Sequence, residues 1–201
     1  ERYVDGPSLS DILHYRQGEP FPIYEVLVYL KSLASGLGYA HSKGIIPCDI
    51  KPGNILVDLG GHIYLTDFGI SKYAGEPEKG TTATRSVFGT THYMSPEQVR
   101  SAHHVDWRTD IWALGVILFE LVSGTLPFDG ETGTAVAVSI ASDEPPLLRR
   151  RQPDAPPGLE KAVMKALAKD VSHRFDTVRA FAQAIAEYAT DAPPSTIATG
   201  A

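Results

Sequence analysis

Apolar residues recur at helical spacing in several separate stretches of the chain. The longest stretch begins near Tyr24, where Val, Leu and Ala return every three or four positions up to a stop at Ser42-Lys43-Gly44. A second stretch, residues 110–122, is apolar on nearly all sides, which predicts a helix buried at the centre of the domain. Shorter stretches with the same spacing predict further helices over residues 8–18, 135–141, 159–168 and 177–189.

Two short apolar runs predict a β-hairpin between the helical stretches. Ile55–Val57 and Ile63–Leu65 are joined through Gly60-Gly61, a pair that is typical of tight turns. Residues 70–95 are rich in Gly, Ser and Thr without periodicity, which predicts a long loop of the kind that is functional or disordered. The loops that flank the two predicted strands carry the polar residues of chemical interest.

Composition and charge narrow the class of protein. With 201 residues, 43% hydrophobic and 21% charged, the chain suffices for one globular domain with a sizeable core. A net charge of −6 argues against broad nucleic-acid binding, which needs a basic face. The single cysteine, Cys48, excludes an internal disulfide framework and fits a reducing cytoplasm.

Nothing in the sequence predicts contact between this segment and a membrane. No apolar leader follows Glu1, so we expect no signal peptide. The most apolar run, residues 111–119, is too short to cross a bilayer. A cytoplasmic location is therefore expected for these residues, and a membrane span elsewhere in a longer parent protein stays open.

Two polar motifs carry residue types that phosphoryl transfer requires. Residues 47–54 read PCDIKPGN, and Asp67 opens the tripeptide Asp-Phe-Gly. Phosphoryl transfer needs a carboxylate beside the attacking hydroxyl, and an amide and a second carboxylate to hold the metal ions that neutralise the triphosphate. Asp49, Asn54 and Asp67 have these identities, and Pro52-Gly53 permits a tight turn between the first two.

The ordered set DxKPxxN, DFG, SPE at 95–97 and DIWALG at 110–115 resembles the large lobe of a protein kinase, nearest to the eukaryotic-like serine/threonine kinases of bacteria. The resemblance implies an α+β protein-kinase-like fold. Residues 1–190 would form its mostly helical C-terminal lobe with a small hairpin, and residues 191–201 a tail or linker. The N-terminal lobe, with its Gly-rich loop and strand lysine, is expected to lie outside this segment.

The resemblance also implies an activity and a set of catalytic residues. The activity is transfer of the γ-phosphoryl group of ATP, with Mg²⁺, to Ser/Thr hydroxyls of protein substrates. Asp49 would orient the hydroxyl and accept its proton, and Lys51 would offset charge on the transferring group. Asn54 and Asp67 would hold the Mg²⁺. Thr90 would bridge Asp49 and Lys51, a feature of serine/threonine kinases.

Nucleotide contacts are implied for the start of the chain and for the first strand. Residues 3–9 resemble the hinge between kinase lobes, so Arg2 and Val4 would bind adenine through their main chains. Leu56 would form the apolar floor beneath the base. An apolar residue on a strand is more often plain core, so the role of Leu56 depends wholly on the resemblance.

Three further residues are implied as supports of the lobe. Asp110 would accept hydrogen bonds from the backbone of the catalytic loop, although an acid there also suits the first turn of a helix. Glu97 and Arg174 would form a buried ion pair that braces the lobe.

The chain departs from the kinase pattern just before the catalytic aspartate. Kinases place His-Arg where this chain has Pro47 and Cys48. A thiol carries no positive charge for a phosphate on the activation loop, so phosphorylation of Thr82 or Thr84 is expected to control activity less than usual. Two interpretations of Cys48 stay open: it is a redox-sensitive thiol or, as is more common for cysteine, a small buried hydrophobic residue.

Three classes of function compete at this point. The first is a protein serine/threonine kinase. The second, favoured by the altered His-Arg positions and the missing lobe, is a pseudokinase or regulatory module that binds partners. The third is a small-molecule phosphotransferase, whose relatives generally lack the long Thr-rich loop ending in GTxxYMSPE. Dimerisation through a longer parent chain is possible under the first two.

Overall fold

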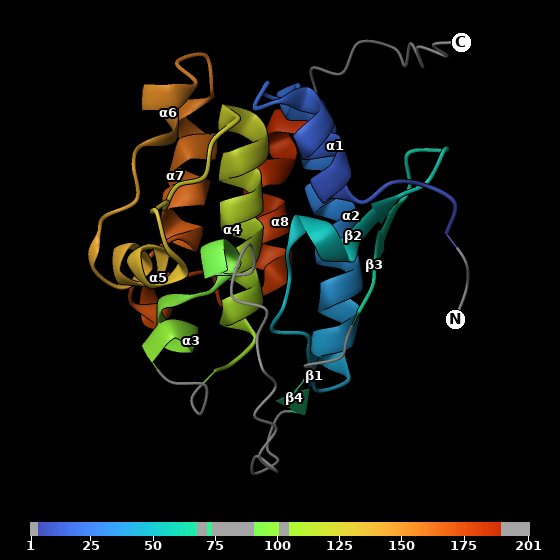
Figure 1. Ribbon diagram of the computed structural model, residues 1–201. Helices are drawn as coiled ribbons and strands as arrows, with labels where there is room; N and C mark the ends of the chain where they lie inside the picture. The colour runs from blue at the N-terminus through green and yellow to red at the C-terminus, as the bar shows by residue number, and fades with distance from the viewer. Residues whose placement is uncertain (1–3, 68–71, 74–90, 101–104, 190–201) are drawn as a thin grey trace.

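The computed structural model describes residues 4–67, 72–73, 91–100 and 105–189 (Figure 1). Within these ranges the chain is mainly helical, and the helices and hairpin predicted from periodicity are present with small shifts at their ends. The α-helices are α1 (Leu9–Arg16), α2 (Ile23–Ser42), α3 (Pro96–Arg100), α4 (Arg108–Ser123), α5 (Gly133–Ser142), α6 (Leu148–Arg151), α7 (Pro157–Ala166) and α8 (Val178–Ala186). The 3₁₀ turns are η1 (Pro52–Asn54), η2 (Thr91–Tyr93), η3 (Val171–His173) and η4 (Glu187–Ala189).

Helix α4 lies at the centre of the domain, between α7 and α2 in Figure 1. Apart from Arg108 and Glu120, all of its residues are buried, which confirms the predicted central helix. Such a helix has no polar face because α2, α6, α7 and α8 contact it from different sides. Trp112 of α4 stacks on Phe128 with ring centroids 5.6 Å apart, so aromatic packing reinforces this core.

Helices α1 and α2 begin and end where the sequence predicts. Ser8 caps α1: its hydroxyl accepts a hydrogen bond from the Asp11 N–H, while the Asp11 carboxylate accepts one from the Ser8 N–H. Helix α2 buries the face formed by its repeating apolar residues against α4 and α8. No helix in the described ranges is long and apolar enough to span a bilayer.

In the described part of the chain, short strands form two antiparallel pairs: β1 (Ile45–Ile46) with β4 (Lys72–Tyr73), and β2 (Ile55–Val57) with β3 (Ile63–Leu65). The second pair is the predicted hairpin, with Ile55 opposite Leu65. The first pair, like the short helices α3 and α6, was not predicted. Segments of two to five residues are too short to show a periodic pattern, so tertiary packing decides their conformation.

The segment before α1 runs beside β2. Ser8 forms an isolated bridge with Leu56, and the Val57 N–H donates to the Pro7 carbonyl at 3.0 Å. A Cβ added at Gly6 would lie 1.9 Å from the Val57 carbonyl oxygen, so this close approach requires glycine. The chain's first described residues are therefore fixed to the strand that carries Leu56.

Candidate active site

The hairpin brings Asn54 and Asp67 to the same place. Asn54 directly precedes β2, and Asp67 lies two residues beyond the end of β3. At this open end of the hairpin, the Thr66 N–H and hydroxyl both donate to the Asn54 carbonyl oxygen, at 2.9 and 3.2 Å. The antiparallel register thus places the two predicted metal ligands on facing chain ends.

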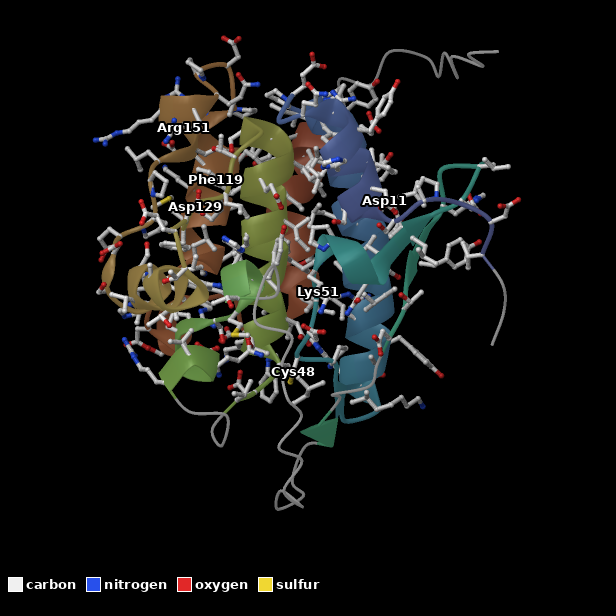
Figure 2. All side chains as sticks on the ribbon, viewed as in Figure 1. Asp11, Cys48, Lys51, Phe119, Asp129 and Arg151 are labelled. Atoms are coloured by element: carbon white, nitrogen blue, oxygen red, sulfur yellow. The ribbon has the colours of Figure 1, made fainter. Side chains whose placement is uncertain are left out.

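Asp49, Lys51 and Asn54 converge within the loop that leads into β2. The Lys51 ammonium donates to Asp49 Oδ2 at 2.7 Å. The Asn54 amide donates to the Asp49 carbonyl oxygen at 3.0 Å and to its Oδ2 at 3.3 Å. Turn η1 makes this possible, because the Asn54 N–H returns to the Lys51 carbonyl oxygen. Figure 2 shows Lys51 between the hairpin and α4.

The donor set at this end of the hairpin fits a hard divalent cation. Because the NH₂ group of Asn54 is engaged by Asp49, the atom that Asn54 can offer to a cation is its Oδ1. Asp67 adds a carboxylate beside it. One amide oxygen and one carboxylate, completed by water and phosphate oxygens, match the octahedral preference of Mg²⁺.

Two residues of the site adopt a backbone conformation that is rare for side-chain-bearing residues. Cys48 has φ of 61° and Asp67 has φ of 58°, both in the left-handed region. Such residues cost about 1–3 kcal/mol each and cluster at functional sites. The third, Gln17 at 51°, is explained by its position as the C-cap of α1. Of the other two residues, Cys48 directly precedes Asp49, and Asp67 is itself a candidate metal ligand.

Asp110 of α4 anchors the candidate catalytic loop, residues 47–54, as predicted. The Cys48 N–H donates to Asp110 Oδ1 at 3.0 Å, and His41 Nε2 lies 2.7 Å from Oδ2. Burial raises the pKa of Asp110, and the hydrogen bonds with His41 and Cys48 act in the opposite direction. The His41 contact was missed, because a single polar residue near the end of an apolar helix gives no distinctive signal.

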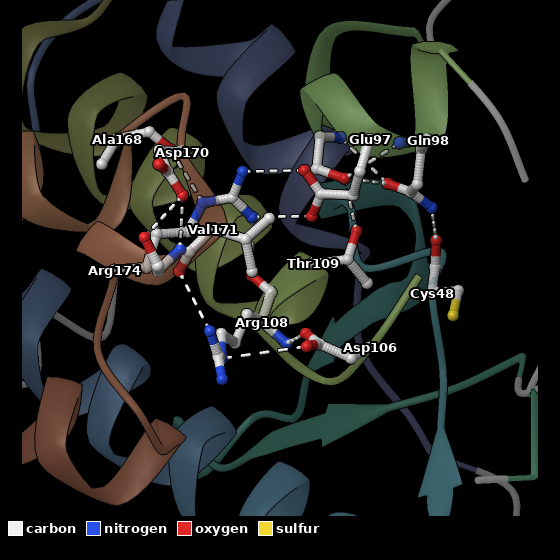
Figure 3. Close-up of polar contacts among 12 residues, drawn as sticks. Cys48, Glu97, Gln98, Asp106, Arg108, Thr109, Ala168, Asp170, Val171 and Arg174 are labelled. Carbon is white, nitrogen blue, oxygen red and sulfur yellow. Dashed lines mark hydrogen bonds and ion pairs between the residues drawn. The ribbon is translucent and has the colours of Figure 1, made fainter. Parts of the chain in front are cut away.

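Gln98 of α3 holds the same loop from its other side. Its Nε2 donates to the Cys48 carbonyl oxygen at 2.7 Å, a contact visible in Figure 3. Its Oε1 accepts from the Ser95 N–H, and the Ser95 hydroxyl lies 2.7 Å from that of Thr109 on α4. No pattern along the chain singles out Gln98, yet its side chain holds the residue before Asp49.

The predicted ion pair between Glu97 and Arg174 is present and bidentate. Arg174 Nη1 and Nη2 donate to the two carboxylate oxygens at 2.7 and 2.8 Å (Figure 3). The Arg174 side chain is 0% exposed, and its Nε and Nη1 also donate to the carbonyl oxygens of Ala168 and Arg108. Each nitrogen of this guanidinium therefore has an acceptor inside the lobe.

A second, part-buried contact joins the segment before α3 to the central helix. The Tyr93 hydroxyl donates to Glu120 Oε2 at 2.7 Å. Burial raises the pKa of the Glu120 carboxyl to about 7, although the hydrogen bond from Tyr93 partly counteracts this effect. Glu120 thus titrates near neutrality rather than in the acidic range.

The raised pKa of Glu120 predicts a pH-dependent stability. The folded protein keeps the proton up to about pH 7 and the unfolded chain loses it near pH 4.5, so stability falls between these values, by roughly 3 kcal/mol. In Glu120→Gln this loss should be absent, because the amide still accepts from Tyr93 but does not ionise. Urea unfolding at pH 5 and pH 8 measures the difference. Equal pH dependence of the two proteins would contradict the assignment.

Several predicted residues lie outside the described residues. They are Arg2, Thr82, Thr84 and Thr90, so the Thr90 bridge and the role of the activation-loop threonines stay predictions. Leu56 is half-buried while its neighbours Ile55 and Val57 are buried, so it lies on the other face of the strand. Val4 precedes the segment that pairs with this strand.

Comparison with known proteins identifies the family of this mainly helical lobe, whose polar loop is braced on the buried central helix. The protein kinase domain family matches residues 1–186. The chain is 39% identical over 176 residues to the probable serine/threonine-protein kinase PknB of Lactococcus lactis, covering 88% of this chain and 27% of that protein.

Two further relatives show the same pattern. The serine/threonine-protein kinase PrkC of Bacillus subtilis is 39% identical over 87% of this chain, and PknB of Mycolicibacterium smegmatis is 36% identical over 87%. The chain spans 26% and 28% of their respective lengths. It therefore belongs to the protein kinase family, to the bacterial serine/threonine type that these relatives represent, and has the kinase fold.

Proposed function

We propose that this chain is the substrate-binding and catalytic lobe, over residues 1–190, of an ATP-dependent protein serine/threonine kinase. The observation that carries the proposal is the convergence of Asp49, Lys51 and Asn54 next to the hairpin end that holds Asp67. Family membership supports it, because relatives named as serine/threonine kinases align with nearly the whole chain.

Each residue has a distinct proposed role in the transfer. Asp49 accepts the proton of a Ser or Thr hydroxyl whose oxygen bonds to the γ-phosphorus, while the bond from that phosphorus to the ADP oxygen breaks. Lys51, 2.7 Å from Asp49, stabilises negative charge on the transferring group. Thr90 supports both side chains. Asn54 and Asp67 hold Mg²⁺, which neutralises the triphosphate when bound.

The adenine is proposed to lie against the start of the chain. The main chain of Val4 would contact the base, and the half-buried Leu56 would form its floor. The pairing of residues 7 and 8 with β2 supports this arrangement, because it fixes the first segment beside the strand of Leu56. The segment would work in the cytoplasm, within a longer protein that can carry a membrane span or a dimer interface.

A catalytically weak pseudokinase or regulatory module is the second candidate. Pro47 and Cys48 favour it, because they replace the family's His-Arg and remove a cation that would pair with an activation-loop phosphate. The contacts of Cys48 weigh against this alternative. Asp110 accepts a hydrogen bond from the Cys48 N–H, and Gln98 donates one to the Cys48 carbonyl oxygen. These two hydrogen bonds can position the loop without an arginine side chain.

Asp67→Asn tests the metal site in the full-length protein. Asn tolerates the left-handed backbone at position 67 but removes the negative charge. Mg²⁺-dependent binding of a fluorescent ATP analogue should weaken about tenfold or more, which corresponds to about 1.4 kcal/mol. Asp154→Asn, at an exposed loop position, is the matched control and should bind normally. Unchanged Mg²⁺-dependent affinity in Asp67→Asn would remove Asp67 from the site.

A further inference from the structure

A cleft of about 760 Å³ lies beside the packing of α2 against α8, apart from the candidate active site. One face of α2, the first turn of α8, β1 and Trp107 line it. Asp49, Asn54 and Asp67 are not among its lining residues. Its volume and mainly apolar lining are those of a site for a small organic molecule.

The cleft is open because the side of α2 that lines it carries several small residues. A Cβ added at Gly38 would meet no atom within 4 Å, so the space beside this residue is empty. Two aromatic side chains lie at the cleft: Tyr39 is 70% exposed and Trp107 is 37% exposed. The Trp107 ring is fixed by a 2.8 Å hydrogen bond from its Nε1 to the Asp176 carbonyl oxygen. These faces offer stacking surfaces to a planar ring.

The charges at the cleft favour an anion. Lys31 on α2 and Arg179 on α8 contribute two cations to the lining, and Asp176 is its one acidic residue. His41 also lines the cleft. The chain as a whole has a net charge of −6, whereas the cleft has a local excess of positive charge. The cleft therefore favours a negatively charged ligand.

His41 connects the cleft to the catalytic loop. Its Nε2 lies 2.7 Å from Asp110 Oδ2, and the other oxygen of this carboxylate accepts the N–H of Cys48. Cys48 directly precedes Asp49. A ligand that contacts the His41 ring is therefore two hydrogen bonds from the backbone that positions the candidate base.

We propose that this cleft binds a small planar aromatic anion, such as an aromatic carboxylate or sulfonate, and that its occupancy acts on the catalytic loop through His41 and Asp110. The ring stacks on Tyr39 and Trp107, and the acidic group pairs with Lys31 and Arg179. The binding site stands independently of the proposed kinase activity, since binding is measured without turnover.

The probe is 1-anilinonaphthalene-8-sulfonate, titrated into the full-length protein with energy transfer from tryptophan as the signal. Trp107 lines the cleft whereas Trp112 is buried in α4. Gly38→Phe fills the empty space and should weaken saturable binding by about tenfold or more. Gly36→Phe is the matched control: it lies on the same helix, also faces open space, and is outside the lining. Equal affinity of the two variants would overturn the site.

Two further measurements separate the parts of the proposal. Lys31→Gln combined with Arg179→Gln should weaken the sulfonate probe but not its neutral analogue, N-phenyl-1-naphthylamine. Equal effects on both probes would overturn the selection of anions.

Saturation with the sulfonate should shift the NMR signals of the His41 ring in the unmodified protein but not in Gly38→Phe. Unshifted His41 signals at saturation would overturn the link to the catalytic loop.

Discussion

Replacing Asp49 with Asn is expected to lower the rate of phosphoryl transfer by about 10²–10⁴-fold, the usual contribution of a positioned base. Asn has the same size and still accepts the Lys51 hydrogen bond that the structure places at 2.7 Å, so the loop should keep its shape. It does not accept a proton from the attacking hydroxyl. The measurement is Mg²⁺-dependent transfer of labelled phosphate from ATP to a generic basic protein by the full-length protein.

Two controls give this experiment its meaning. Nucleotide affinity should be nearly unchanged in Asp49→Asn, because Asp49 acts on the hydroxyl and not on the nucleotide. Asp154→Asn, an exposed acid distant in sequence from the loop, should retain full activity. A rate that survives in Asp49→Asn would refute the assigned base. Absence of transfer in the unmodified full-length protein would instead favour the pseudokinase.

Truncating Arg174 to Ala is expected to destabilise the domain by about 3–5 kcal/mol, which is the typical result of breaking a buried ion pair. The guanidinium is 0% exposed and bonds Glu97 at 2.7 Å. Its loss leaves the Glu97 carboxylate without this counterion and removes a side-chain donor from the carbonyl oxygens of Ala168 and Arg108. Denaturant unfolding, followed by circular dichroism, measures the change in free energy.

Two comparison variants distinguish the effect of breaking the Glu97–Arg174 ion pair from the effect of removing an arginine side chain as such. Arg150→Ala, on the exposed face of α6, should change stability by less than about 0.5 kcal/mol. Combining Arg174→Met with Glu97→Leu should be less damaging than Arg174→Ala, because neither charge is then left buried alone. If the double variant is as unstable as the sum of its single changes, the two residues are not coupled.

The two predictions concern one continuous network. Glu97, paired with Arg174, is followed by Gln98, whose side chain holds the Cys48 carbonyl oxygen. Asp110 holds the Cys48 N–H from the opposite side. Both peptide groups of the residue before the candidate base are thus held by side chains of the lobe. This explains how the loop keeps its geometry although cysteine stands where related kinases have arginine.

The sequence by itself determined the elements with a strong local pattern. Helices α2 and α4 followed from repeating apolar residues, and the hairpin from two apolar runs around Gly60-Gly61. It also placed Asn54 and Asp67 on the loops that flank the two predicted strands, whereas their shared role as metal ligands was implied by family resemblance. The ion pair of Glu97 with Arg174 came from family resemblance, not from any pattern along the chain.

Only the tertiary structure decided how the catalytic loop is held and where the cleft lies. His41 and Asp110 are 69 residues apart, and Gln98 and Cys48 are 50 apart. Single polar residues at such separations leave no periodicity, and their partners are fixed by helix packing. The cleft beside Gly38 likewise depends on the packing of α2 and α8, which places small residues of α2 beside the start of α8.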